Sequence, residues 1–154
     1  MYKRQVTNND GVSIGSSTLY LDGIKVGDGG QTTGRLNLTV FPTSDFKFNL
    51  ALFGADNIFS NINAEDFDEP DGGNAQLPAY KLFDFGAGYN FDLFGNNAYL
   101  RLNINNLFDE EYYPEMENNY LATDDSTNYM GINTANRIFP GWGRTWNVGL
   151  TYRF

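Results

Sequence analysis

The chain has 154 residues and a formal net charge of −9, with no cysteine and no histidine. An acidic surface has the wrong sign to neutralise phosphates, so nucleic acid is not expected as a partner. Without these two residue types the chain forms no disulfide and no thiolate metal site, and it lacks the commonest general base. The sequence therefore predicts neither an enzyme nor a cofactor.

The first five residues, MYKRQ, are basic and follow no period, unlike the acidic chain after them. They resemble the translation of a transposon-type sequencing adapter. We interpret residues 1–5 as non-native and separate them from residues 6–154. An ordinary flexible N-terminus is the alternative. If residues 1–5 are foreign, the native chain continues upstream of Val6.

Apolar and polar residues alternate with a period of two along most of the chain, as expected for strands with one buried face. The alternation is weak in 13–24 and strong in five later segments, which are 35–41, 46–53, 83–93, 98–105 and 143–154. We therefore expect an all-β fold, an antiparallel up-and-down meander of about six strands.

The links between these segments alternate in length. Residues 42–45 and 95–97 are tight turns, whereas 61–79 and 114–142 are long and polar. An up-and-down sheet then has its long links at one end, and its short turns and C-terminus at the other. Outer-membrane β-barrels sort their loops in this way, with apolar residues outside and polar residues inside. Twelve steps from Trp142 to Phe154, tilted ~45°, rise about 28 Å, enough to cross the apolar band.

Six strands are too few to close a membrane barrel, because bacterial single-chain barrels begin at about eight. The chain would have to assemble with copies of itself or form part of a larger barrel. The character of residues 1–5 favours the larger barrel.

Three stretches carry a resemblance to a known family: VGDGGQTT at 26–33, LRLNINNLFDEEYY at 100–113 and FPGWGRTWNVGLTYRF at 139–154. Together they resemble the C-terminal region of TonB-dependent outer-membrane receptors, over roughly residues 19–154. The resemblance implies the last six strands of a 22-strand transmembrane barrel in a Gram-negative outer membrane, with the N-terminal plug and TonB-contacting box missing. It implies energised uptake of a scarce nutrient, such as an iron–siderophore complex, haem, cobalamin or a glycan. The implied partners are outer-membrane lipid, the plug, the TonB complex and the barrel assembly machinery.

The resemblance and the two-residue period assign roles to four sets of residues. We expect the even-numbered residues from 146 to 154 to face lipid. The outer-membrane assembly signal would comprise Asn147, Gly149, Tyr152 and Phe154. The aromatic girdle would comprise Trp142, Trp146, Tyr152 and Phe154. The residues lining the lumen would include Arg101, Asn103, Asn105 and Arg153.

The fourth set consists of four tyrosines in and beside the long C-terminal loop. Exposed aromatic rings among amide side chains suit capture of a planar or glycan-like ligand. The alternative is that these rings pack on one another or belong to the girdle. The candidate extracellular ligand contacts are Tyr112, Tyr113, Tyr120 and Tyr129.

Two alternatives to the receptor segment remain open. They are a small self-assembling outer-membrane barrel and a secreted β-sandwich that binds a ligand. The acidic stretch 64–73 departs from the EF-hand spacing at Pro70, Asp71 and Leu77, so no metal site is expected there.

Overall fold

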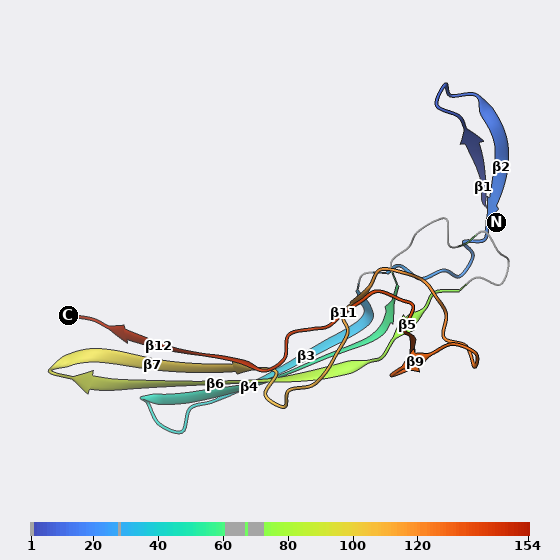
Figure 1. Cartoon of the computed structure of the whole chain (residues 1–154). Helices are drawn as coiled ribbons and strands as arrows, with labels where there is room; N and C mark the ends of the chain where they lie inside the picture. Colours follow the sequence, from blue (N-terminus) through green and yellow to red (C-terminus); the bar gives the residue numbers. More distant parts are fainter. Residues whose placement is uncertain (1, 28, 61–66, 68–72) are drawn as a thin grey trace. The chain divides into compact units, whose positions relative to one another are not determined.

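The computed structural model describes residues 2–27, 29–60, 67 and 73–154 (Figure 1). The chain divides into two compact units. We call Thr32–Asp56, Ala79–Tyr112 and Pro140–Phe154 the sheet unit, and Met1–Gln31, Asn57–Pro78 and Tyr113–Phe139 the loop unit. The described residues form strands and turns without an α-helix, which confirms the predicted all-β class.

The main sheet is a meander in which strands that follow one another along the chain lie side by side (Figure 1). The pairs β12–β7, β7–β6 and β6–β4 are antiparallel, as predicted. The order across the sheet is β12–β7–β6–β4–β3. The strands are β3 (Gly30–Val40), β4 (Phe46–Phe59), β6 (Tyr80–Leu93), β7 (Asn96–Asn105) and β12 (Thr145–Tyr152).

The strand register brings the apolar positions of the sequence onto one face. Each apolar residue of β12 lies opposite an apolar residue of β7, and the alignment continues into β6 and β4. Side chains alternate between the two faces of a strand, so the polar positions share the opposite face. One apolar row across the sheet consists of Val148, Leu102, Ala87 and Phe48.

Short local interactions close one end of the sheet. The turn between β6 and β7 consists of Phe94 and Gly95, whose φ angles are 54° and 77°. Two consecutive positive φ values are typical of a type I′ hairpin turn. This turn begins one residue before the predicted 95–97. In the link between β3 and β4, the Thr43 hydroxyl oxygen accepts hydrogen bonds from the amides of Asp45 and Phe46.

The strand lengths differ from the prediction. β4 and β6 have 14 residues each and extend beyond the predicted 46–53 and 83–93. β12 has 8 residues instead of the predicted twelve, and Trp142 and Phe154 lie outside it. At ~3.3 Å per residue and a ~45° tilt, β6 spans about 30 Å, whereas β12 spans about 16 Å. The long middle strands, rather than the last strand, therefore match the thickness of an apolar band.

The loop unit contains short paired segments. The predicted strand within 13–24 is β2 (Ser13–Leu19), and it pairs with β1 (Tyr2–Thr7) in a separate two-stranded sheet instead of joining the meander. A local turn explains this difference: the Asn8 side-chain oxygen accepts the amides of Asp10 and Val12, and Gly11 has a φ of 76°. Residues 2–5, which we set apart as foreign, take part in this hairpin.

The predicted loop 114–142 contains two nested two-stranded ladders. β8 (Glu115–Met116) pairs with β11 (Ile138–Phe139), and inside that pair β9 (Asn128–Tyr129) pairs with β10 (Ile132–Asn133). In the predicted loop 61–79, β5 (Gln76–Leu77) pairs with the end of β4. Most of the acidic stretch 64–73 lies outside the described residues.

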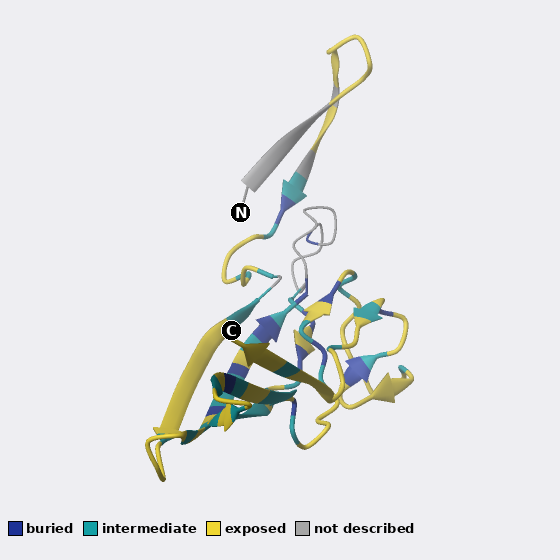
Figure 2. Cartoon of the chain, turned by 90° about the vertical axis from the view of Figure 1, so that its left-hand side faces the viewer, coloured by how far each residue is buried: buried dark blue, intermediate teal, exposed yellow. Residues whose placement is uncertain are grey.

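The large buried apolar side chains are in the loop unit. They include Ile58, Phe67, Leu77, Met116 and Ile132. In the sheet unit only alanines are buried among the apolar residues, namely Ala51, Ala55 and Ala98. Figure 2 colours the residues of both units by their burial.

Candidate functional site

The apolar face of the sheet is uncovered in the sheet unit. Trp146, Val148 and Leu150 on β12 are 71%, 57% and 60% exposed. Leu36 and Leu38 on β3, at the opposite edge of the sheet, are exposed as well. Three of the residues that we expected to face lipid, Trp146, Val148 and Leu150, thus lie on an accessible apolar face.

Aromatic rings lie along this face toward both ends of the strands. At the end with the short turns, Tyr89 stacks on Phe91 with ring centroids 5.7 Å apart. At the other end, Phe83 and Phe108 meet edge to face at 5.2 Å. Two of the predicted girdle residues share this face, because Trp146 lies opposite Ile104 and Tyr152 lies opposite Ala98. Exposed Trp142 lies before β12 in the chain.

The polar face carries amide and cationic side chains joined by hydrogen bonds across the strands. The Asn103 amide donates to the Asn147 side-chain oxygen at 2.9 Å, and the Asn105 amide donates to the Thr145 hydroxyl at 3.1 Å. Arg101 shares their parity on β7. The structure therefore places three of the four predicted lumen residues on one face. Arg153 follows β12, and its backbone amide donates to the Asn97 carbonyl at 3.1 Å.

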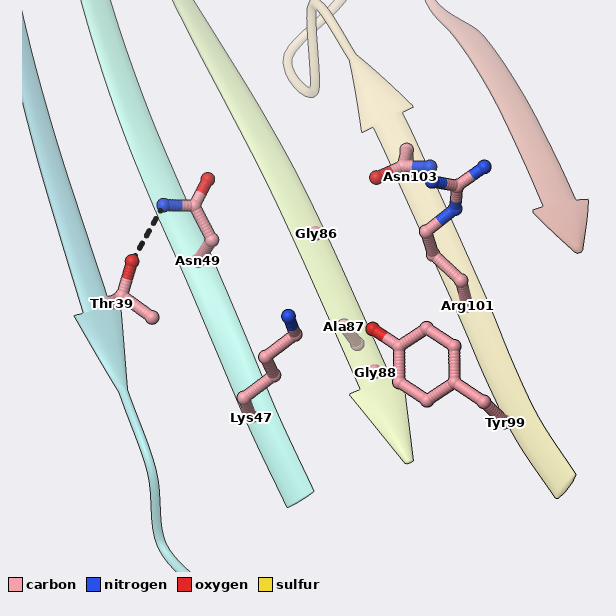
Figure 3. A pocket seen from close by; sticks show the side chains of 9 residues that line it. All are labelled: Thr39, Lys47, Asn49, Gly86, Ala87, Gly88, Tyr99, Arg101 and Asn103. Carbon is pink, nitrogen blue, oxygen red and sulfur yellow. Dashed lines mark hydrogen bonds between the residues drawn. The ribbon is translucent and has the colours of Figure 1, made fainter. Parts of the chain in front are cut away.

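A hollow of about 290 Å³ lies on this polar face (Figure 3). Two glycines of β6 form the middle of its floor, because each leaves its position on the face without a side chain. Lys47 lies opposite Gly88, which lies opposite Arg101, so the two cations flank a glycine. The lining residues are Thr39, Lys47, Asn49, Gly86, Ala87, Gly88, Tyr99, Arg101 and Asn103.

Tyr99 extends across the floor of the hollow toward β6 (Figure 3). A Cβ atom added at Gly88 would lie 2.2 Å from the Tyr99 hydroxyl oxygen, so this close approach requires glycine. The Lys47 ammonium lies 5.7 Å from the centroid of the Tyr99 ring, within the range of a cation–π interaction. The predicted lumen residues include Arg101 and Asn103 but not Lys47 and Tyr99, because only the pairing of the strands brings all four side chains together.

A second group of contacts joins the stretches 100–113 and 139–154. Asn106, which is 4% exposed, donates from its side-chain amide to the carbonyls of Glu110 and Trp142. Its side-chain oxygen accepts the Glu110 amide at 2.8 Å. The Asp109 carboxylate accepts the backbone amide of Arg144 at 2.6 Å. We call Asn106, Asp109 and Arg144 the corner, because they join the segment after β7 to the segment before β12.

The same contacts account for the glycines of the last stretch. A Cβ at Gly141 would lie 2.0 Å from the Tyr112 ring, and one at Gly143 would lie 3.0 Å from an Asp109 carboxylate oxygen. Tyr112 also packs on Tyr80, with ring centroids 4.5 Å apart. Tyr112 is therefore held in the sheet unit by its neighbours. In contrast, a Cβ at Gly149 would meet only an Arg101 nitrogen, at 4.0 Å, so crowding does not require glycine there.

The other three candidate tyrosines lie in the loop unit. Tyr113 is buried and contacts Tyr129 edge to face at 6.5 Å, whereas Tyr120 and Tyr129 are exposed. Tyr120 borders a hollow of about 290 Å³, together with Asn133 and Asn136. The Asn136 side chain already binds both backbone groups of Tyr120, so its amide is occupied in holding the loop.

Tyr152 and Phe154, two of the predicted assembly residues, lie near each other with ring centroids 6.2 Å apart. The Tyr152 hydroxyl accepts a hydrogen bond from the Asn96 side chain at 2.9 Å, which ties the end of β12 to the start of β7. Asn147 points to the polar face, where it binds Asn103.

Within the described residues, no group of three or more acidic, histidine or cysteine side chains is arranged to hold a metal ion. The same part of the chain contains no helix long and apolar enough to cross a membrane. No protein-family model, curated protein or solved structure matches the chain.

Proposed function

We propose that this chain is the C-terminal barrel segment of a TonB-dependent outer-membrane receptor. The complete receptor takes up a scarce nutrient of the iron–siderophore, haem, cobalamin or glycan class, with energy supplied through the TonB complex. The observation that carries the proposal is the uncovered apolar face of a sheet whose other face is polar. The stretches named above provide the link to this family.

The energetics of this face support a lipid environment. Burying a side chain such as Val or Leu contributes about 1.5–3 kcal/mol relative to leaving it in water. Several such residues are exposed together on one face, including Leu36, Leu38, Val148 and Leu150. Monomeric soluble proteins rarely expose a large continuous apolar patch. Hydrocarbon covers such a face, and the aromatic rings toward both ends match the girdles of outer-membrane barrels.

The sheet edges support a larger assembly. Among the described strands of the sheet, β3 and β12 are the edge strands, and each has one neighbour. Bare edges are open to further pairing, and barrel closure removes them. Additional strands of the same receptor would pair with both edges.

Two alternatives use the same observations differently. A small self-assembling outer-membrane barrel would pair the two edges between copies of this chain. A secreted β-sandwich would cover the apolar face with a second sheet about 10 Å away. No described segment of the sheet unit forms such a second layer.

Adjacent cysteines test the membrane orientation. Val148→Cys and Gly149→Cys should be made separately in the complete receptor and treated in outer-membrane preparations with a membrane-impermeant thiol reagent. We expect labelling at 149, on the polar face, and protection at 148. Labelling of 148 but not 149 would reverse the assignment, and equal labelling of both would contradict a lipid-facing sheet.

Loop topology and uptake separate the receptor from its alternatives. An epitope tag between Asp124 and Asp125, in an exposed turn, should be detected on intact cells. A tag near Asn119 would be unsuitable, because the Asn119 side chain binds Ser60, Gly73 and Ala75. Deletion of the complete reading frame should abolish TonB-dependent uptake of one of the named nutrient classes. Uptake of all four classes that is unchanged by the deletion would contradict the transport function.

A further inference from the structure

The hollow on the polar face collects positive charge in a chain whose net charge is −9. Lys47 and Arg101 line it, and no acidic side chain does. Neither cation forms an ion pair with the described residues, whose salt bridges join Arg35 to Asp84 and Arg137 to Glu117. Two unneutralised cations beside one cavity favour an anion as its occupant.

A neighbouring hollow of about 370 Å³ extends the same positive region. Lys47 and Tyr99 line both hollows, and Arg153 lines the second. The second hollow also lacks an acidic residue, and its other lining residues are Asn90, Asn97 and Thr151. The positive region therefore extends over strands β4, β6, β7 and the end of β12.

The register gives the first hollow a defined shape. Two successive rows cross it, Lys47–Gly88–Arg101 and Asn49–Gly86–Asn103. The outer residues of each row lie two strands apart, or about 10 Å, with a glycine between them. Tyr99 occupies the space over Gly88, while a Cβ at Gly86 would approach nothing closer than 3.5 Å. The open floor is therefore over Gly86, between the cations and the amides.

We propose that this hollow binds a carboxylate group, held by Lys47, Arg101 and the hydroxyl of Tyr99. The guanidinium group of arginine matches the two oxygens of a carboxylate, and the Lys47 ammonium adds a second charge. The side-chain oxygen of Asn103 lies 3.5 Å from the Cβ position of Gly86, so one side of the open floor presents an acceptor. A carboxylate directs its two oxygens to one side and tolerates this acceptor, whereas phosphate has oxygens on every side.

This assignment goes beyond the proposed transport function and does not depend on the membrane. The carboxylate has two possible sources: a free organic acid, or a glutamate side chain of a polypeptide segment lying against the polar face. The volume of about 290 Å³ suits either group.

Side-chain nuclear magnetic resonance of the 154-residue chain in uncharged detergent micelles provides the test. The probes are succinate, its neutral analogue succinamide, inorganic phosphate and the peptide acetyl-Gly-Glu-Gly-amide. We expect succinate to shift the Arg101 guanidinium Nε–H signal saturably, and succinamide to leave it unchanged. A peptide affinity equal to or above that of succinate would identify a glutamate side chain as the source, and a lower one a free acid.

Variants at the two cations test the site itself. Lys47→Gln and Arg101→Gln should each weaken succinate binding about five- to tenfold, because each removes one charge-assisted contact. Binding to the Arg101→Gln variant is followed at the Lys47 or Tyr99 signals. Lys81→Gln removes the same charge from an exposed position on β6 outside this hollow and should change the affinity less than twofold. Backbone signals from the β6–β7 pairing establish that each variant keeps its sheet. Three results would overturn the proposal. They are an equal affinity for succinate in all three variants, tighter binding of phosphate than of succinate, and no saturable shift with either succinate or the glutamate peptide.

Discussion

The loop unit and the sheet unit bury their apolar side chains differently. Met116 in the loop unit is 0% exposed, and it shares its unit with buried Ile58, Leu77 and Ile132. In the sheet unit the large apolar side chains of β12 point outward from a single layer. The loop unit has a core of large buried apolar side chains. The sheet unit leaves its large apolar side chains exposed on one face. Under the proposed function, water surrounds the ladders of the loop unit and lipid covers the apolar face of the sheet.

The largest expected effect concerns the core of the loop unit. Met116→Ala should destabilise this unit by about 2–5 kcal/mol, because it leaves a cavity among buried side chains. Met130→Ala is the matched control, since Met130 is 50% exposed in a turn and should change stability by less than about 0.5 kcal/mol. Amide hydrogen exchange in β9 and β10 measures the stability of the loop unit in both variants. Equal protection in the two variants would contradict a cooperative core in the loop unit.

The next prediction concerns the apolar face of the sheet. Leu150→Arg should destabilise the complete protein in a lipid bilayer by about 2–4 kcal/mol, because it places a charge in hydrocarbon. Thr151→Arg, one residue away on the polar face, should cost less than about 1 kcal/mol. Urea unfolding of receptors reconstituted into vesicles measures both variants. Equal costs for the two substitutions would remove the distinction between the faces.

The corner should contribute stability within the sheet unit. Asn106→Ala should cost about 2–3 kcal/mol, because it removes three hydrogen bonds that the buried Asn106 side chain makes to the backbone of Glu110 and Trp142. Asn105→Ala removes one hydrogen bond from an exposed residue, and we expect a cost near 0.5 kcal/mol. Denaturant unfolding followed at Trp142 and Trp146 compares the two. A smaller effect at Asn106 than at Asn105 would show that the corner does not hold β12 to β7.

The smallest effect on stability is expected at Phe154, which is fully exposed. Phe154→Leu keeps an apolar side chain and should change the free energy of unfolding by less than about 0.5 kcal/mol. If Tyr152 and Phe154 belong to an assembly signal, the amount of inserted receptor should nevertheless decrease sharply. Quantification of receptor in isolated outer membranes distinguishes the two roles. A normal amount of Phe154→Leu receptor in the outer membrane would contradict the assembly-signal role and leave only the aromatic-girdle role.

Features that depend on local alternation along a strand could be predicted from the sequence. The parity of Trp146, Val148 and Leu150 predicted their common face, because side chains of a strand alternate whatever its neighbours are. The prediction that the strand within 13–24 belongs to the meander was wrong. A side-chain cap at Asn8 and a positive φ at Gly11 form a local hairpin there, and the hydrophobic period contains no information about these contacts.

The candidate site was predicted only in part, because the sequence gives the face of each side chain on its own strand but not its neighbours on other strands. Arg101, Asn103 and Asn105 follow from the parity of one strand, and the sequence places them on a polar face by itself. The tyrosines of the long loop looked equivalent in the sequence, but Tyr112 is packed against Tyr80 and Gly141 while Tyr120 is exposed.

The sequence by itself determined the strand class, the two chemically different faces and the tight turns, because each depends on residues close together in the chain. Only the tertiary structure decided which strands pair and in what register. That register places Lys47 and Arg101 on either side of Gly88, although Lys47 is 54 positions from Arg101 in the sequence numbering. It also brings Asp109 to the amide of Arg144. Such pairs form because the edge hydrogen bonds of one strand must be satisfied by another, and the choice of partner depends on the whole sheet.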